Sequence, residues 1–97
     1  MEKRYYTYIL TNKREGSLYI GVTSNLIQRI HQHKTKAQKG FTSKYNLSLL
    51  VHYEVHCTPY DAISREKQLK NWRRQWKIDL IEQKNPEWKD LFEQIIR

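Results

Sequence analysis

The stretch YYTYIL, TNKREGS, LYIGV and TSNLIQRIHQH, residues 5–33, decides the fold of this chain. Residues 5–10 and 18–22 are rich in aromatic and β-branched side chains, and a polar segment that contains one glycine separates them. This pattern predicts two antiparallel strands joined by a long loop. A helix over residues 25–34 is expected to follow directly, with Ser24 as its N-cap.

One register of the two strands gives a clean apolar face. Strand side chains alternate between the two faces of a sheet. The apolar and β-branched side chains then share one face: Thr7, Ile9, Leu18, Ile20 and Val22. The opposite face receives the aromatic side chains of Tyr6, Tyr8 and Tyr19. We therefore expect this face to form a shelf lined by tyrosines. Gly21 lies beside them and lets another group approach the backbone.

The first helix is expected to carry two pairs of side chains at a spacing of four residues. Leu26 and Ile30 form an apolar pair that faces inward, whereas Arg29 and His33 stack one turn apart on another face. Because the helix leaves directly from the end of the second strand, this second face can look back over the tyrosines.

Residues 49–55, LLVHYEV, predict a third strand. Strict alternation would place four of its side chains on one face: Leu49, Val51, Tyr53 and Val55. Glu54 would then face solvent on the other side.

Helix signals follow this strand. Thr58 is expected to cap a helix with Pro59 in its first turn, and this helix is expected to bend or restart near Arg73. Asn85 is expected to cap a further helix that has Pro86 in its first turn. The chain therefore reads as α/β of the α+β type, with a small three-stranded antiparallel sheet flanked by helices. Residues 1–97 are expected to form a single domain.

A carboxylate stands on the mostly apolar side of the helix after Pro59. The apolar members of that side are Ala62, Ile63, Leu69, Trp72 and Trp76. Their helical spacing predicts that both tryptophans belong to the core. Glu66 lies among them, either as a partner of a nearby arginine or as a functional ligand, and the pattern leaves both interpretations open.

Composition points to a polyanionic partner. The net charge is +8 and the isoelectric point is near 9.7, which favours nucleic acid over a membrane surface. No apolar run approaches the roughly 20 residues that cross a bilayer. We therefore expect a cytoplasmic protein without a membrane partner, and we favour a monomer. Cys57 is the only cysteine, which excludes an intramolecular disulfide.

Two basic segments are candidate phosphate contacts. Residues 34–45, KTKAQKGFTSKY, hold four lysines without an acid, and residues 65–77 hold six basic side chains and one acid, interleaved with Trp72 and Trp76. The candidates are Lys34, Lys36, Lys39, Lys44, Arg65, Lys70, Arg73 and Arg74. Phe41 or Tyr45 could offer an aromatic plane to a base. The alternative for the first segment is an ordinary solvated loop.

Several of these residues resemble the signature of the GIY-YIG nuclease superfamily. The triplet YIG at residues 19–21 is intact, whereas YTY at residues 6–8 keeps the tyrosine but has Tyr6 where the family often has glycine. Arg29 lies at the spacing of the family arginine. The segments GFTSKY, AISREKQLKNWRR and NPEW resemble the small single-domain bacterial branch, so the resemblance covers nearly the whole chain.

The resemblance implies a metal-dependent endonuclease that cleaves DNA, including structured or repair intermediates. Glu66 would hold one Mg²⁺ or Mn²⁺ ion, since a hard cation can be bound by few carboxylates with waters completing its shell. Arg29 would neutralise the charge that develops on the phosphate.

The resemblance leaves the identity of the base open. Tyr8 and Tyr19 would orient or deprotonate the attacking water, and His33 is the alternative base because its ordinary pKa is better placed. Asn85 is a secondary active-site candidate, although capping also explains it. The competing function is a non-catalytic module that binds nucleic acid on the same fold, and the altered first triplet favours it.

Overall fold

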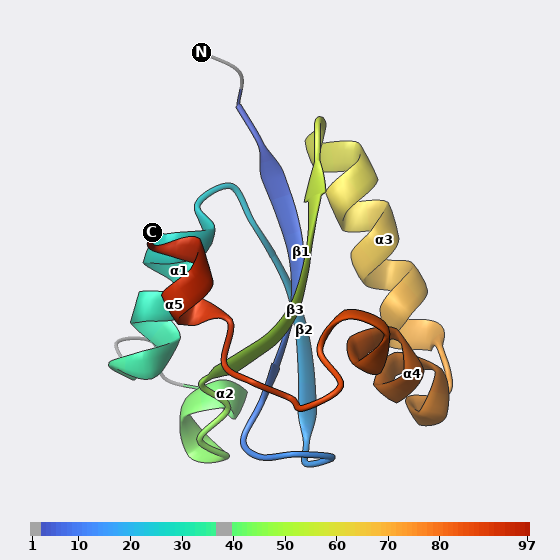
Figure 1. The fold of residues 1–97 in the computed structure, drawn as a ribbon. Coiled ribbons are helices and arrows are strands. Elements are labelled where there is room, and N and C mark those ends of the chain that lie inside the picture. The colour runs from blue at the N-terminus through green and yellow to red at the C-terminus, as the bar shows by residue number, and fades with distance from the viewer. Residues whose placement is uncertain (1–2, 37–39) are drawn as a thin grey trace.

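The structure is a computed structural model that describes residues 3–36 and 40–97, with only the backbone of Phe41. Its centre is a three-stranded antiparallel sheet in the order β2-β1-β3 (Figure 1). The strands are β1 (Tyr5–Thr11), β2 (Leu18–Thr23) and β3 (Leu49–His56).

The register of β1 and β2 is the one that the apolar pattern predicts. Ile9 lies opposite Ile20, and Tyr8 lies opposite Gly21. Because opposite residues in an antiparallel pair share a face, the tyrosines and Gly21 fall together on one side of the sheet. The expected sheet and its flanking helices are confirmed.

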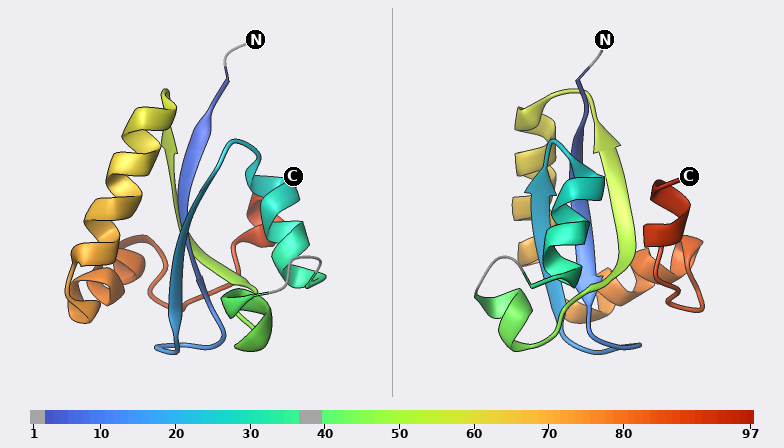
Figure 2. Two further views of the ribbon diagram at one scale, coloured as in Figure 1. Left: turned by 180° about the vertical axis from the view of Figure 1, so that it is seen from behind. Right: turned by 90° about the vertical axis from the view of Figure 1, so that its left-hand side faces the viewer.

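Helices cover both faces of the sheet. The helices α3 (Pro59–Asn71) and α4 (Arg74–Lys84) lie on one side, and α1 (Leu26–Lys34) and α5 (Phe92–Ile95) lie on the other (Figures 1 and 2). A short helix, α2 (Phe41–Lys44), follows α1. No helix in the described parts of the chain has the length and apolar character needed to cross a membrane.

Two hydrophobic cores result, one on each face. The core under α3 and α4 is built on Ile9, Ile20 and Val51, and the core under α1 is built on Tyr8 and Leu10. The expected tyrosine shelf is therefore wrong as an open surface. The α1 and α5 side chains cover this face, and Tyr8 is fully buried beneath them.

A β-bulge interrupts β3. Ile9 lies opposite His52 while Leu10 lies opposite Leu50, so Val51 is an extra residue without a partner of its own in β1. The expected strict alternation along this strand is therefore wrong. Val51 packs in the core under α3 and α4, whereas Tyr53 packs against the core under α1.

The start of α3 and the break after it agree with the sequence predictions, whereas the N-cap of α1 differs. Thr58 accepts a hydrogen bond from the Asp61 amide and Pro59 begins α3, as expected. The helix ends at Asn71 and a new one begins at Arg74, which confirms the predicted restart. The N-cap of α1 is Asn25 instead of Ser24, because the Asn25 Oδ1 accepts the hydrogen bond from the Gln28 amide.

Asn85 ends α4 and does not cap a new helix. Its side-chain amide donates to the carbonyls of Val51 (3.1 Å) and Lys89 (2.9 Å), and its Oδ1 accepts from the Lys89 amide (2.9 Å). The expected helix from Pro86 is therefore wrong, because these contacts fold residues 85–89 into a turn against β3.

The C-terminal segment then covers part of the outer edge of β3. The Leu91 amide donates to the Leu50 carbonyl (2.7 Å), and the Asp90 carboxylate accepts from the Leu50 amide (3.1 Å). The same carboxylate pairs with Lys34 at the end of α1. One acidic side chain thus joins the first helix, the third strand and the C-terminal segment.

Replacing Asn85 with alanine should destabilise the protein. The variant would leave the buried Val51 carbonyl and two backbone groups of Lys89 without their partner, so we expect the free energy of unfolding to fall by about 2 kcal/mol or more. Urea unfolding followed by circular dichroism measures this loss. The matched control is Asn71→Ala at an exposed helix end, which should change stability by less than about 0.5 kcal/mol. Equal stability of the two variants would contradict the bracing role.

Candidate active site

Tyr8 occupies the centre of the candidate site because β1 is the middle strand. Its ring lies across β2 at Gly21, where an added Cβ would be 2.5 Å from both Cζ and Oη of Tyr8. Such a contact is impossible for a real side chain, so the ring needs glycine at this position. The YIG glycine therefore holds the tyrosine in place.

A hydrogen-bonded chain runs from Tyr8 through His33 to α2. The Tyr8 Oη lies 3.1 Å from Nε2 of His33, and Nδ1 of His33 lies 3.1 Å from Oγ1 of Thr42. The ring of Tyr19 completes the cluster, with its centroid 6.4 Å from that of Tyr8 and 5.8 Å from that of His33. The three rings therefore form one contiguous group.

The surroundings of Tyr8 and His33 keep both side chains neutral. Burial, followed by the nearby Tyr19, raises the pKa of Tyr8 well above its usual value, against the lowering effect of the Arg29 charge. Burial, followed by the charge of Arg29, lowers the pKa of His33. At neutral pH the pair is thus a phenol beside a neutral imidazole, which has one donor and one acceptor nitrogen.

Glu66 and Arg29 reach the same cluster from opposite helices. Glu66 lies on α3 with a side chain that is 20% exposed, and its carboxylate pairs with Lys70 at 3.2 Å. The charges of Glu66 and Arg29 act in opposite directions on the pKa of Tyr8, so both lie within electrostatic range of its hydroxyl. The structure thus places the rings of Tyr8, Tyr19 and His33 in contact, with Arg29 and Glu66 near enough for their charges to act on Tyr8.

Asn85 is the site candidate that the structure does not bring to this cluster. It lies beside β3, on the far side of β1 from Gly21, and its amide is used by backbone groups. A structural role explains all of its contacts.

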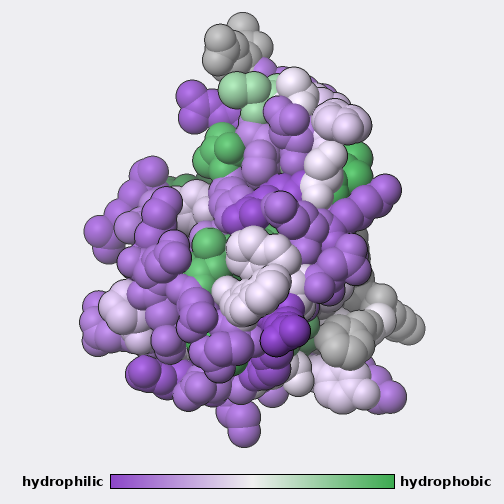
Figure 3. All heavy atoms as spheres, turned by 90° about the vertical axis from the view of Figure 1, so that its right-hand side faces the viewer, coloured by the Kyte–Doolittle hydropathy of each residue, from purple (hydrophilic) through white to green (hydrophobic). Residues whose placement is uncertain are grey.

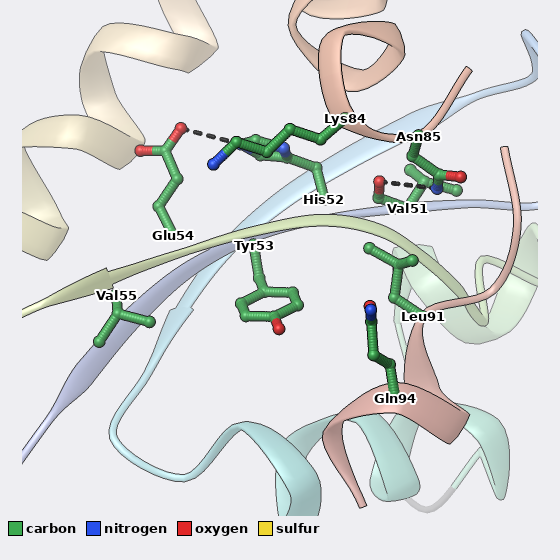
Figure 4. Close-up of a pocket in the computed structure, with 9 residues that line it drawn as sticks. All are labelled: Val51, His52, Tyr53, Glu54, Val55, Lys84, Asn85, Leu91 and Gln94. Carbon is green, nitrogen blue, oxygen red and sulfur yellow. Dashed lines mark hydrogen bonds and ion pairs between the residues drawn. The ribbon is translucent and has the colours of Figure 1, made fainter. Parts of the chain in front are cut away.

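Glu54 is an ionised carboxylate that joins His52 to Arg65, and the sequence pattern did not reveal this role. It accepts hydrogen bonds from Arg65 Nε and His52 Nε2, both at 2.8 Å, so the expected solvent-facing position is wrong. Burial opposes its ionisation, but the hydrogen bonds from His52 and Arg65 outweigh burial and lower its pKa to about 2. Glu54 and His52 border a cavity of about 540 Å³ beside β3 (Figure 4).

Glu54 and Glu66 have different basic partners in the structure. Arg65 pairs with Glu54 and leaves Glu66 to Lys70. The spacing of His52, Glu54 and His56 at every second residue is the signal that could have predicted a shared face for these groups.

Metal binding at Glu66 would involve few protein ligands. Within residues 3–36 and 40–97, no three His, Cys, Asp or Glu side chains are grouped closely enough to hold an ion. A lone, partly exposed carboxylate fits Mg²⁺ or Mn²⁺, which can keep several waters and bind substrate oxygens. It does not fit zinc, which takes three or four protein ligands.

The basic candidates fall into two groups. Three are held by intramolecular contacts: Lys34 pairs with Asp90, Arg65 pairs with Glu54, and Arg74 donates to backbone carbonyls of residues 15 and 16. Lys36, Lys44 and Arg73 are exposed outside these contacts, and Lys70 is also exposed although it pairs with Glu66. Lys39 lies outside the described residues. The exposed group is the better placed to meet a phosphate backbone.

Comparisons with known proteins show which sequences and structures this chain is similar to. The family profile described as the GIY-YIG catalytic domain matches residues 4–79. A UPF0213 protein of Staphylococcus haemolyticus is 32% identical, over 84% of this chain and 98% of that protein. A UPF0213 protein of Clostridium perfringens is 38% identical, over 82% of this chain and 85% of that protein.

A solved structure also resembles this fold. The solution NMR structure of a UPF0213 protein from Bacillus halodurans has a TM-score of 0.56 and 25% sequence identity. The match covers 90% of this chain and 92% of that one.

The low pKa of His33 should make the protein less stable in mild acid. Below the ordinary histidine pKa of about 6.5, the unfolded chain binds a proton that the folded ring resists, so stability should fall as pH decreases. Urea unfolding at about pH 7.5 and about pH 5 tests this for the parent and for His33→Gln. The parent should lose more stability than the variant. Equal losses would contradict the burial of a neutral imidazole.

Proposed function

This chain belongs to the GIY-YIG catalytic domain family, and on that premise we propose that it is a metal-dependent endonuclease that hydrolyses phosphodiester bonds in DNA. The observation that carries the proposal is the convergence of the Tyr8–His33 hydrogen bond with Arg29 and Glu66. Structured or repair intermediates are the proposed class of DNA, and the positive net charge supports a polyanionic substrate.

Tyr8 and His33 act together as the base. Because the raised pKa keeps Tyr8 a phenol, it can take a proton from water only if it gives its own proton to Nε2 of His33 at the same time. Thr42 helps by accepting a hydrogen bond from the Nδ1–H group, which leaves Nε2 free to accept. Tyr19 orients the water from the adjacent ring position.

Arg29 and Glu66 act on the phosphate. Arg29 donates to the phosphoryl oxygens as negative charge develops on them, while the bond between phosphorus and the leaving oxygen breaks. Glu66 is the residue that would hold a Mg²⁺ or Mn²⁺ ion, which when bound supplies further charge stabilisation to the phosphate and the leaving group.

The second candidate function is a nucleic-acid-binding module without catalysis. Tyr6 in the first triplet is the observation that favours it, since the family often has glycine there. The intact cluster of Tyr8, His33 and Arg29 favours the enzyme instead.

Replacing Glu66 with glutamine should separate the two functions. Metal-dependent cleavage of branched, flapped and nicked DNA should fall by about a hundredfold or more, because a charge that acts at the transition state is lost. Binding measured without metal should be unchanged or slightly tighter, because the variant removes a negative charge. Glu93→Gln, at an exposed position on α5, is the matched control and should keep full cleavage. Full cleavage by Glu66→Gln would overturn the assignment of the metal ligand.

Replacing Lys36 with alanine should weaken binding through lost phosphate contact. The slope of log affinity against log salt should decrease in magnitude by about 0.9, with a similar loss on every duplex sequence. Lys34→Ala is the informative contrast, because Lys34 is held by Asp90 and the Ser48 carbonyl. That variant should lower stability and leave the slope nearly unchanged. A reversed pattern would show that the intramolecular contacts do not decide which lysines bind DNA.

A further inference from the structure

The two tryptophans after Glu66 form an exposed aromatic groove, contrary to the prediction that both belong to the core. Trp72 is partly buried against the core, but Trp76 is 50% exposed. Their rings meet edge to face with centroids 6.1 Å apart. A groove of about 280 Å³ runs beside them, lined by Trp72, Trp76, Asp79, Leu80 and Gln83.

The cause of this exposure is the break between α3 and α4. Trp72 and Arg73 have extended backbone conformations, so α4 does not continue the apolar stripe of α3 in the same direction. Figure 3 shows this face of the molecule, where pale side chains of intermediate hydropathy gather at the centre beside a hydrophobic one, among mostly hydrophilic side chains.

An arginine guanidinium lies near each of the two rings. The Arg65 guanidinium lies 5.0 Å from the ring centroid of Trp72 while it is fixed to Glu54 by two hydrogen bonds. The Arg73 guanidinium lies 5.6 Å from the ring centroid of Trp76. The Trp72 ring, which contacts the fixed Arg65, is therefore oriented before any ligand arrives, and this lowers the entropy cost of binding.

The surface chemistry favours a nucleobase as the occupant. A flat exposed indole stacks well on any base, and basic side chains around it attract the attached phosphates. Arg73 lies over the Trp76 ring, and Lys67 and Lys70 are exposed on α3, the helix that leads to Trp72. A protein partner would be better served by a wider apolar surface with fewer charges at its centre. Bases within a duplex are stacked on each other, so the fitting ligand is an unpaired base.

We propose that the groove beside Trp72 and Trp76 binds an unpaired nucleobase of the substrate, so that the preferred substrate carries a single-stranded segment next to the cleaved bond. This proposal rests on the proposed nuclease function and extends it to the class of substrate. Trp72 follows Glu66 by six positions, which is a rise of about 9 Å along the helix axis. This length matches about three nucleotides of a stacked strand.

Tryptophan fluorescence provides a direct test without metal. The parent is titrated with a single-stranded thymidine oligonucleotide and with a blunt hairpin duplex, and Trp88 gives a constant background because it is buried. We expect the single strand to quench the emission. Trp76→Ala should weaken single-strand binding by about tenfold or more, whereas duplex binding should change less than about twofold. Trp76→Phe should keep most of the single-strand affinity because a ring remains.

The matched control is Tyr60→Ala, which removes an exposed aromatic ring at the far end of α3. It should leave both affinities unchanged, and circular dichroism should show that each variant is folded. If Trp76→Ala lowers the affinity for both ligands equally, or for neither, the proposed role of the groove is overturned and the proposed nuclease function is not. A sedimentation profile in which Trp76→Ala dissociates a dimer would also overturn it, because the groove would be a self-interface. A parent that binds neither ligand would overturn the proposed nuclease function as well.

Discussion

The contact between the Tyr8 ring and the bare backbone of Gly21 is the constraint on which the candidate site depends. The ring occupies the space that any side chain at position 21 would need, and this places its hydroxyl against His33. The same burial keeps the phenol protonated and the imidazole neutral. Packing and proton chemistry therefore have one origin, because the glycine that admits the ring also fixes the environment that sets both pKa values.

Contacts between residues that lie near each other in the sequence could be predicted well. The register of β1 and β2 follows from alternation alone, because only one pairing puts Thr7 and Ile9 on the apolar face. The start of α3 at Thr58 and Pro59 also carries its own local signals. The cap of α1 was harder, since Ser24 and Asn25 have similar capping preferences and the backbone decides which oxygen reaches the helix.

Contacts between distant segments account for what the sequence could not show. Lys34 meets Asp90 across 56 positions, and Arg65 meets Glu54 only after α3 has docked on the sheet. These pairings decide which basic side chains stay available, and no local pattern encodes them. The exposure of Trp76 has the same reason, because a change of helix direction at residues 72–73 overrides the helical spacing. The contacts among Tyr8, Tyr19 and His33 were easier, since they involve one hairpin and the helix directly after it.

The bracing of β3 by Asn85, Asp90 and Leu91 has a consequence for aggregation. These residues lie beyond the range 4–79 that the family profile matches, yet they occupy hydrogen-bonding groups along the outer edge of this strand. An uncovered edge is a template for pairing with strands of other molecules. The C-terminal segment therefore prevents the edge of the sheet from pairing with a strand of another molecule. A chain shortened to the matched range would keep Tyr8, Arg29 and Glu66 but would be prone to self-association.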